Sequence, residues 1–336
     1  MNEQEEWIMN TVRWGLLSTA KINRQIIPAI ADSQRGEVLA VASRDDETAQ
    51  AYAAKWEIPH AFGSYDAMLT SDLIDAVYIS LPNHLHAEWS IRAMEKGLHV
   101  LCEKPFALSV DEVDQMIAAS QRYDRVLAEA FMYRHHPQMV IAGEWAHSGR
   151  LGDICVVRSV FNFTLRSQHN VRLVPEYGGG SLWDVGIYPV SFAQFIIGEP
   201  PQWVSGSQWI GETGVDETFA GILHFSGDRI AQISSSFRTP FYTNTEIIGT
   251  QGRLTLNQPF GVLDEQSKMI FHPSDGEPIE IPVPEKGLYL GEVEDMHAAI
   301  LDGAPNYLTL DETRDHIRTI TALYQAARTN QVVQLD

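Results

Sequence analysis

The stretch Gly-Leu-His-Val-Leu-Cys-Glu-Lys-Pro, residues 97–105, decides how the first half of the chain is interpreted. Its apolar centre is short and is bounded by glycine and proline, a pattern typical of a fully buried strand. Glu103 and Lys104 follow at the carboxyl end of that strand. Open parallel sheets bind ligands beyond the carboxyl ends of their strands, so we expect Lys104 to face a ligand. The alternative is a solvated lysine in an ordinary loop.

Strand and helix patterns alternate on both sides of this stretch. Further buried strands are predicted at residues 12–17, 37–42, 76–80 and 126–130. Helical spacing of apolar residues separates them, which predicts a right-handed, doubly wound parallel sheet. We therefore expect residues 1–130 to form a Rossmann domain for a dinucleotide, with residues 1–10 as a loose tail.

The first strand runs into a turn of small residues and then a helix, an arrangement that offers a helix N-terminus to a pyrophosphate. The usual Gly-x-Gly-x-x-Gly fingerprint is degraded here, with Gly15, Leu17 and Ala20 in its three places. On its own this signal is weak, because many helices begin after a glycine and a serine.

The end of the second strand carries the residues expected to distinguish the two nicotinamide cofactors. An acid there would bind the free ribose of NAD, whereas an arginine accommodates the 2′-phosphate of NADP. This chain has Ser43-Arg44 ahead of Asp45. The sequence therefore predicts NADP rather than NAD, the alternative being a surface arginine at a strand end.

Polar residues also follow the strand at 76–80. Asn83, His84 and His86 belong to the same predicted sheet edge as Lys104. We expect Asn83 and His86 to line the cofactor or substrate site, while helix capping and packing are the alternative roles. Zinc is not favoured, because no cysteine or acid cluster accompanies the histidines, and we predict no metal site.

The second half changes character at about residue 131. Strands are predicted at residues 154–163, 202–210, 218–225, 229–237, 243–249 and 252–256. Short connections at 226–228 and 250–252 indicate antiparallel hairpins. We therefore expect residues 131–336 to form an α+β domain for substrate binding and oligomerisation, with a large, mostly antiparallel open sheet. Its final helices, near 289–302 and 310–330, are expected to pack back on the first domain.

One face of that sheet is expected to meet another subunit. Trp203, Trp209 and Phe237 are apolar residues assigned to this face. A helix-free apolar face needs a cover, so the sequence predicts a homodimer or homotetramer formed through the sheet.

A second informative stretch is residues 178–189, Gly-Gly-Gly-Ser-Leu-Trp-Asp-Val-Gly-Ile-Tyr-Pro. The glycines let the backbone approach a ligand and lead into a helix. Asp184 and Tyr188 are four residues apart, hence neighbours on one helical face. A carboxylate beside a phenol can position a substrate hydroxyl while the phenol exchanges its proton. The alternative is a capped amphipathic helix with a tyrosine at the edge of the core.

Composition narrows the class of protein. The 336 residues carry a formal charge of −20, which argues against nucleic acid and against anionic membrane surfaces as partners. No apolar run is long enough to span a bilayer, and the acidic start is not that of a signal peptide. Cys102 and Cys155 lie in apolar runs and are predicted to be buried free thiols, so a cytoplasmic location is expected.

The chain resembles the Gfo/Idh/MocA oxidoreductase family. The resemblance depends on Glu103-Lys104-Pro105 and on residues 178–188, and it extends over nearly the whole length. Within the family the chain is similar to the NADP-dependent D-xylose dehydrogenases and the dimeric dihydrodiol dehydrogenases. These share a start like residues 13–20, the Ser43-Arg44 pair, and a tyrosine where many relatives carry histidine.

The resemblance implies hydride transfer between NADP(H) and a carbinol carbon of a sugar or cyclic polyol, without metal. Lys104 would touch nicotinamide and substrate through a motif whose bond to Pro105 is cis. Asp184 would bind the reacting hydroxyl, and Tyr188 or Lys104 would take its proton. The other implied cofactor contacts are Gly15, Ser18, Thr19 and Ala20 at the pyrophosphate, Ser43 and Arg44 at the 2′-phosphate, and Leu81, Asn83, His86 and Glu103 near the nicotinamide ribose.

Substrate contacts and two rival functions complete the expectations. Tyr133, Arg166, Asp184 and Tyr188 are the predicted substrate-binding residues, with specificity in the loop at 163–178. One rival is a glycoside hydrolase with tightly held NAD that oxidises, eliminates and re-reduces its substrate. The other is a non-catalytic NADP-binding regulator. The sequence leaves open which sugar is used, the direction of the reaction, and dimer against tetramer.

Overall fold

The computed structural model describes residues 11–167, 169–261 and 267–335; the tail predicted at residues 1–10 lies outside them. The described chain forms two compact units. The first contains the residues up to His135 together with Gly287–Thr313, and the second contains His136–Lys286 with the residues from Arg314 on. Residues 287–313, assigned by the sequence to the second domain, thus belong to the first unit.

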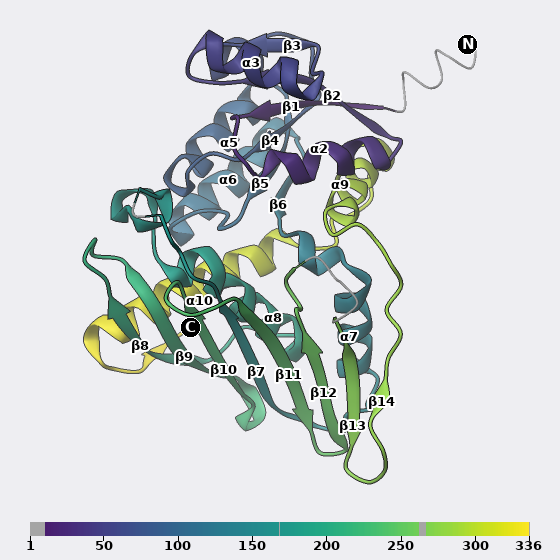
Figure 1. Ribbon diagram of the computed structural model, residues 1–336, viewed down its shortest axis with the longest axis vertical. Helices are drawn as coiled ribbons and strands as arrows, with labels where there is room; N and C mark the ends of the chain where they lie inside the picture. Colours follow the sequence, from purple (N-terminus) through teal and green to yellow (C-terminus); the bar gives the residue numbers. More distant parts are fainter. Residues whose placement is uncertain (1–10, 168, 262–266, 336) are drawn as a thin grey trace. The chain divides into compact units, whose positions relative to one another are not determined.

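Six parallel strands form the sheet of the first unit, in the order β3-β2-β1-β4-β5-β6 (Figure 1). This is the doubly wound Rossmann order, so the predicted fold class of the first half is confirmed. The strands are β1 (Val12–Leu17), β2 (Gly36–Ala42), β3 (His60–Phe62), β4 (Ala76–Ile79), β5 (His99–Glu103) and β6 (Leu127–Ala130).

Helices cover both sides of this sheet. Figure 1 shows α5 and α6 on one side and α2 with α9 on the other, and each pair is in contact. The helices of the unit are α2 (Asn23–Asp32), α3 (Asp46–Trp56), α4 (Tyr65–Leu69), α5 (His86–Glu95), α6 (Val110–Tyr123) and α9 (Leu290–Asp302), with short turns η1 (Asn83–Leu85) and η2 (Met132–His135).

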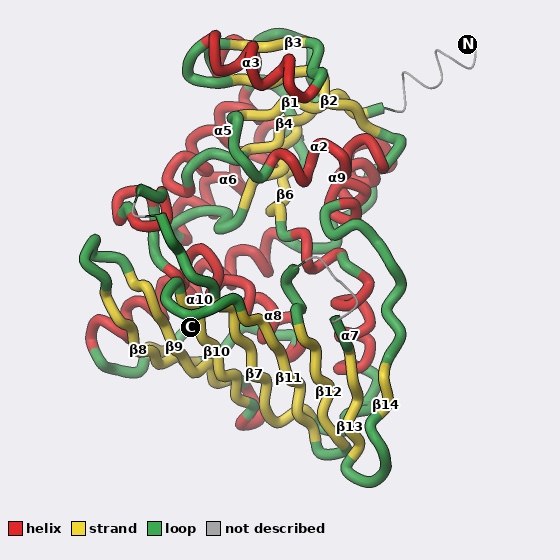
Figure 2. The backbone as a smooth tube through the Cα atoms, viewed as in Figure 1, coloured by secondary structure: helices red, strands yellow, loops and turns green. Residues whose placement is uncertain are grey.

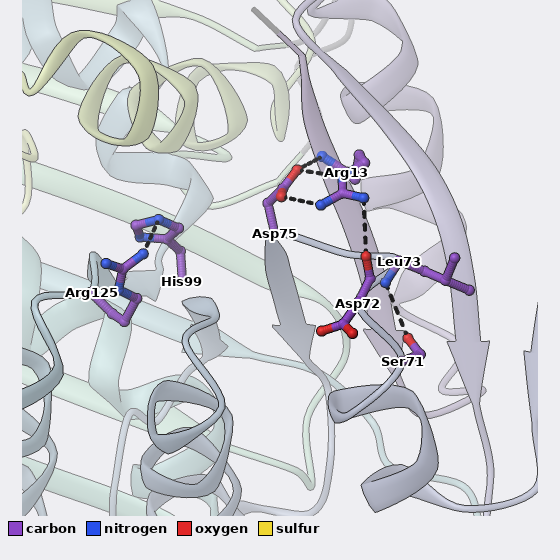
Figure 3. Close-up of polar contacts among 7 residues, drawn as sticks. All are labelled: Arg13, Ser71, Asp72, Leu73, Asp75, His99 and Arg125. Atoms are coloured by element: carbon purple, nitrogen blue, oxygen red, sulfur yellow. Dashed lines mark hydrogen bonds and ion pairs between the residues drawn. The ribbon is translucent and has the colours of Figure 1, made fainter. Parts of the chain in front are cut away.

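Polar contacts fix the amino ends of the central strands (Figure 3). The guanidinium of Arg13, on β1, donates to both carboxylate oxygens of Asp75, which precedes β4, at 2.9 and 2.6 Å. A further bond from Arg13 reaches the carbonyl of Asp72 at 3.2 Å. These contacts hold β1 against β4 at the edge opposite the predicted site.

Nine strands form the sheet of the second unit, in the order β14-β13-β12-β11-β7-β10-β9-β8-β15. Only β7 and β10 run parallel; every other neighbouring pair among these strands is antiparallel. The predicted large, mostly antiparallel sheet and its two short hairpins are therefore confirmed. The strands are β7 (Ile154–Asn162), β8 (Trp203–Ile210), β9 (Asp216–His224), β10 (Ile230–Ser236), β11 (Tyr242–Gly249), β12 (Gly252–Asn257), β13 (Met269–Pro273), β14 (Ile279–Glu280) and β15 (Val333–Gln334).

Helices of the second unit pack on one face of its sheet. In Figure 2 the red helices lie behind the yellow strands, and α8 (Ile187–Ile197) contacts β7 and β10 directly. The others are α7 (Pro137–His147) and most of α10 (Leu310–Thr329), whose residues from Arg314 on belong to this unit rather than to the first. None of the described helices is both long and apolar enough to cross a membrane.

Two details of the second unit differ from the sequence prediction. Cys155 is exposed, not buried, because the pairing of β7 with β11 slips between Ile248 and Gly249 and leaves this thiol beside the irregularity. Phe237 is buried inside its own chain against Phe163, with ring centroids 5.1 Å apart, so it does not belong to the open face. Cys102 is buried, as predicted.

The open face of the second sheet bears a shallow groove of about 630 Å³ across its central strands. Arg158 lies at its centre, 3.0 Å from the Gln232 oxygen that accepts from it and 3.5 Å from the carboxylate of Glu246. Small residues surround these groups, among them Ser205 and Ala220. The groove therefore combines a few charged groups with small and apolar residues such as Val160 and Ile222.

Helix α9 is joined to β1 by a buried hydrogen bond in the core of the first unit. The indole Nε1 of Trp14 donates to Nε2 of His297 at 2.9 Å. Nε2 must carry no proton to accept this bond, so the imidazole is neutral, with Nδ1 3.2 Å from the hydroxyl of Ser33. Burial, aided by Arg35, lowers the pKa of His297 to about 4.

This bond predicts an acid-sensitive contribution to stability. The folded pKa of His297 lies below its unfolded value of about 6.5, so the stabilisation is complete above pH 6.5 and is lost as the pH falls towards 4. We expect the difference in free energy of unfolding between wild type and His297→Gln to shrink over that window in urea titrations. The exposed His60→Gln serves as control, and a difference independent of pH would contradict the assignment.

Candidate active site

The turn after β1 differs from the sequence prediction in its register. Gly15, given the first fingerprint place, lies inside β1, where a Cβ atom would meet Ile74 Cδ1 at 2.6 Å. The turn itself begins at Ser18, whose φ of +149° is one that glycine adopts most easily. The turn thus begins three residues after the place that the sequence prediction gave to the first fingerprint position.

A buried hydrogen-bond network fixes this turn. The hydroxyl of Ser18 lies 2.7 Å from that of Ser80 and accepts from the backbone N–H of Ala20 at 3.0 Å. Asn23 closes the network, donating to the Ser18 carbonyl at 2.8 Å and accepting from the Ser80 hydroxyl at 2.7 Å. The Ser18 side chain thus holds the turn together, while the side chain of Thr19 is partly exposed.

The end of β2 suits a phosphate group. Arg44 is exposed, and no described residue forms a hydrogen bond with its guanidinium. The neighbouring carboxylate of Asp45 is already used, because it caps α3 by accepting from the N–H of Thr48 at 2.8 Å. Ser43 is buried beside them. A free cation beside an occupied carboxylate fits the 2′-phosphate of NADP better than the 2′-hydroxyl of NAD.

The loop after β5 carries Lys104, which is partly buried. Its peptide bond to Pro105 is cis, as the resemblance implied. The carboxylate of Glu103 accepts from the N–H of Lys104 at 3.2 Å and, at its other oxygen, from the hydroxyl of Tyr78. The main chain of Lys104 is therefore fixed by the residue before it, and Tyr78 on β4 fixes that residue in turn.

His86, predicted to line the site, is instead fully buried. Its ring nitrogens lie 2.8 Å from the carbonyl oxygens of Pro105 and of Leu81. The imidazole therefore bridges the loops that follow β5 and β4, and Leu81 is likewise buried. Asn83, in the same loop, is partly exposed and remains a candidate for ligand contact.

Two buried carboxyl groups near this loop were not predicted from the sequence. Glu129, on β6, accepts from the hydroxyl of Thr313 at 2.9 Å. Glu292, on α9, is 2% exposed, and neither of its oxygens has a hydrogen-bond partner in the described chain. Burial raises the pKa of Glu292 well above its usual range, and the negative charge of Glu103 adds to this effect. Burial also raises the pKa of Glu103. A lone acid inside an apolar strand, as in residues 127–130, is the signal that could have revealed Glu129.

The second unit contributes the predicted Asp184 and Tyr188. A π-helical turn, η5 (Leu182–Gly186), precedes α8, so the continuous α-helix expected here is interrupted. Turns of this kind often occur at functional sites. Gly179, before it, leaves room for the protein's own backbone: a Cβ there would meet the carbonyl oxygen of Arg172 at 2.6 Å.

Asp184 is paired with an arginine that the sequence prediction had left in a specificity loop. Nε of Arg172, on the short turn η3 (Val171–Leu173), donates to Oδ2 of Asp184 at 2.5 Å. The Asp184 side chain is 12% exposed and the Arg172 side chain 41%. The carboxylate of Asp184 is therefore held by an arginine whose side chain is partly exposed to solvent.

Tyr188, four residues further on, lies among aromatic rings. The ring centroids of Phe161 and Phe260 are 5.2 and 5.4 Å from its own. Those two phenylalanines stack on each other with centroids 5.7 Å apart. The phenol is thus held by apolar contacts that fix its direction, which suits a group that exchanges a proton at one atom.

The remaining predicted substrate residues differ in their surroundings. Tyr133 is fully buried, edge-on to Phe131 with centroids 4.9 Å apart, so it packs the end of β6 and does not face solvent. Arg166 is exposed on its loop. Among the described residues, no group of three or more histidine, cysteine, aspartate or glutamate side chains could hold a metal ion.

Comparison with known proteins agrees with this geometry. Residues 12–131 match the profile of the GFO_IDH_MocA oxidoreductase family, NAD-binding Rossmann fold, and residues 139–255 match the GFO/IDH/MocA C-terminal domain. A D-xylose 1-dehydrogenase (NADP(+)) of Haloferax volcanii is 38% identical over 96% of this chain and 99% of its own.

Two further proteins extend the comparison. A trans-1,2-dihydrobenzene-1,2-diol dehydrogenase of Xenopus laevis is 33% identical over 71% of this chain and 73% of its own. The crystal structure of an aldose-aldose oxidoreductase from Caulobacter crescentus, complexed with glycerol, superposes with a TM-score of 0.90 at 25% identity, covering 97% of this chain and 100% of that one. Matches of this extent across both compact units confirm the resemblance, and the chain belongs to the GFO/IDH/MocA family of oxidoreductases.

Proposed function

We propose that the protein transfers a hydride between NADP(H) and a carbinol carbon of a sugar or cyclic polyol. The observation that carries this proposal is the similarity, over almost the whole chain, to a D-xylose 1-dehydrogenase that uses NADP. Arg44 supports the cofactor assignment, since its guanidinium is exposed beside a carboxylate already used as a helix cap.

The proposed roles follow from what each side chain can do. Bound NADP⁺ would supply the hydride acceptor. Asp184 accepts a hydrogen bond from the reacting hydroxyl, and Arg172 keeps its carboxylate in place. Tyr188 removes the hydroxyl proton as the carbonyl forms, with Lys104 as the alternative acceptor. Catalysis of this kind typically contributes about 10²–10⁴-fold.

The proposed cofactor contacts differ from the sequence prediction at the pyrophosphate and near the nicotinamide ribose. The turn at Ser18 and Ala20, with Thr19, is proposed to hold the pyrophosphate through its backbone, and Ser43 with Arg44 to hold the 2′-phosphate. Near the nicotinamide ribose, Asn83 and Lys104 are proposed contacts, because their side chains are partly exposed. The buried His86 and Leu81, and the partly buried Glu103, then act by fixing those loops.

We further propose that two copies associate through the open face of the second sheet. The groove there carries both signs of charge, Arg158 beside Glu246, so a two-fold arrangement can set the arginine of one copy against the glutamate of the other. Small residues such as Ser205 and Ala220 allow a second sheet to approach closely.

We also propose a cytoplasmic location. Both thiols are free, and Cys155 is exposed, so a reducing compartment would keep it from forming a disulfide between copies. Native mass under reducing and oxidising conditions would test this point, because a covalent dimer is expected only after oxidation.

The activity itself predicts a defined outcome in a substrate screen. Aldoses, cyclitols and dihydrodiols are offered with NADP, and turnover is followed at the nicotinamide absorbance. We expect oxidation of at least one sugar or diol, and loss of that turnover in Lys104→Met with NADPH binding retained. Glycoside cleavage without net absorbance change, or tight NADPH binding without any turnover, would overturn the proposal in favour of a hydrolase or a regulator.

The cofactor preference predicts a selective loss in Arg44→Ala. A hydrogen-bonded guanidinium–phosphate contact is worth about 1.5–3 kcal/mol, so NADP should bind roughly 10–100-fold more weakly while NAD binding barely changes. Dissociation constants for both cofactors, measured by fluorescence titration, decide the matter. The exposed Arg122→Ala, on α6, is the control. Equal losses for NAD and NADP would show that Arg44 does not select the cofactor.

The interface predicts a change of mass in Arg158→Glu. Wild type is expected at two or four times the chain mass of 37.6 kDa in light scattering after size exclusion. The charge reversal places like charges across the proposed contact, so the variant should elute as a monomer, whereas Arg122→Glu should not. A wild-type protein that elutes as a monomer would contradict the proposed interface.

A further inference from the structure

The first residue of β9, Asp216, accepts hydrogen bonds from two distant segments. Its Oδ2 accepts from the hydroxyl of Ser181 at 2.8 Å and from the N–H of Leu182 at 2.9 Å. Its Oδ1 accepts from the hydroxyl of Tyr324, on α10, at 2.6 Å. Asp216 is 2% exposed, and three donors of this kind use most of the acceptor capacity of a carboxylate.

Two of these donors belong to the start of the helical segment that carries Asp184. The first N–H groups of any helix lack partners within the helix, and a serine in the capping position usually accepts one of them. Ser181 occupies that position but makes no side-chain cap; its hydroxyl donates to Asp216, which accepts the N–H of Leu182 in its place. The cap of this helix is thus supplied by a strand 34 residues later in the chain.

The surrounding residues are shaped around this carboxylate. Gly180 has a φ of +125°, and a Cβ there would meet Oδ1 of Asp216 at 2.1 Å and the hydroxyl of Tyr324 at 2.8 Å. Any side chain at this position would displace the acceptor. A second bond braces the next helix, since Gln194 of α8 donates to the hydroxyl of Thr319 on α10 at 2.8 Å.

Two opposing effects act on the pKa of Asp216. Burial raises the pKa of Asp216, while the bonds from Tyr324, Ser181 and Leu182 act in the opposite direction. Burial and the carboxylate together raise the pKa of Tyr324 well above its usual range, so this phenol remains a donor.

We propose that Asp216 is a positioning residue for the reaction, holding the π turn so that Asp184 and, one turn later, Tyr188 keep the directions that substrate binding and proton exchange need. The inference rests on the roles proposed above for those two residues. Asp184 lies two residues beyond Leu182, whose N–H the carboxylate fixes. Displacement of a reacting group by about 1 Å can cost about 10²-fold in rate, so loss of the cap should act chiefly on turnover.

The test compares three variants of this group with a matched control. Asp216→Ala removes all three bonds, and Tyr324→Phe removes one. Asp216→Asn keeps an oxygen for Ser181 and Leu182 and can donate to the Tyr324 oxygen, so it should restore the position without the charge. The control is Glu199→Ala, whose carboxylate accepts from the N–H of Ser226 at 2.8 Å and from Arg229 at 2.9 Å, at the opposite end of β9.

We expect kcat to fall roughly 10–100-fold in Asp216→Ala, less in Tyr324→Phe, and to recover most of its value in Asp216→Asn. KM for NADP should stay unchanged in all three, and Glu199→Ala should lower the melting temperature without lowering kcat. If Asp216→Ala fails to fold, the remaining kcat values decide. The inference then requires kcat of Tyr324→Phe to lie below that of both Asp216→Asn and wild type.

Two results would overturn the inference: kcat within twofold of wild type in both Asp216→Ala and Tyr324→Phe, or an Asp216→Asn variant as slow as Asp216→Ala. Tyr188→Phe, measured in parallel, separates this failure from failure of the proposed function. A fully active Tyr188→Phe refutes the roles assigned to the helix, whereas an inactive one beside normal Asp216 variants refutes only the positioning.

Discussion

The imidazole of His86 is the contact on which the carboxyl edge of the parallel sheet depends. One buried ring joins the loop after β4 to the loop after β5, through the carbonyls of Leu81 and Pro105. The Ser18–Ser80 contact joins the loop after β1 to the same β4 loop. Three loops that come from distant parts of the chain are therefore fixed to each other before any ligand binds. Such preorganisation removes ordering costs from binding.

Charge near this edge is arranged to tolerate an anionic cofactor in a protein of formal charge −20. Glu103 and Glu292 are both present in the first unit, and two carboxylates close to a dinucleotide would repel its phosphates. Burial raises the pKa of both. The carboxylate of Asp45 is occupied by its capping bond from Thr48, which lowers its pKa, and Arg44 beside it is exposed. Arg44 is therefore a cation available to an anionic group at the end of β2.

The sequence predicts the parts of this molecule that depend on local pattern. Alternating strands and helices indicate the Rossmann sheet, and two short turns indicate hairpins, because backbone geometry at those places is set by neighbouring residues. Gly15 resembles a fingerprint glycine in the sequence, but it lies inside β1, where Ile74 leaves no room for a Cβ atom. Cys155 was expected to be buried, but a slip in strand pairing, which composition does not encode, exposes it.

Prediction from local sequence pattern fails for residues whose contacts are distant in the sequence. The glycines ahead of Asp184 have two physical explanations, close approach of a ligand or close approach of the protein's own chain, and both predict the same letters. In the structure, Gly179 lies against the backbone of Arg172 and Gly180 against the carboxylate of Asp216, so close approach of the protein's own chain explains both glycines. The sequence also does not distinguish a helix capped by its own serine from one capped by a remote carboxylate. Ser181 is compatible with either arrangement, and in the structure it donates to Asp216. The helical segment that carries Asp184 and Tyr188 therefore takes its position from tertiary contacts with strands and helices distant in the sequence.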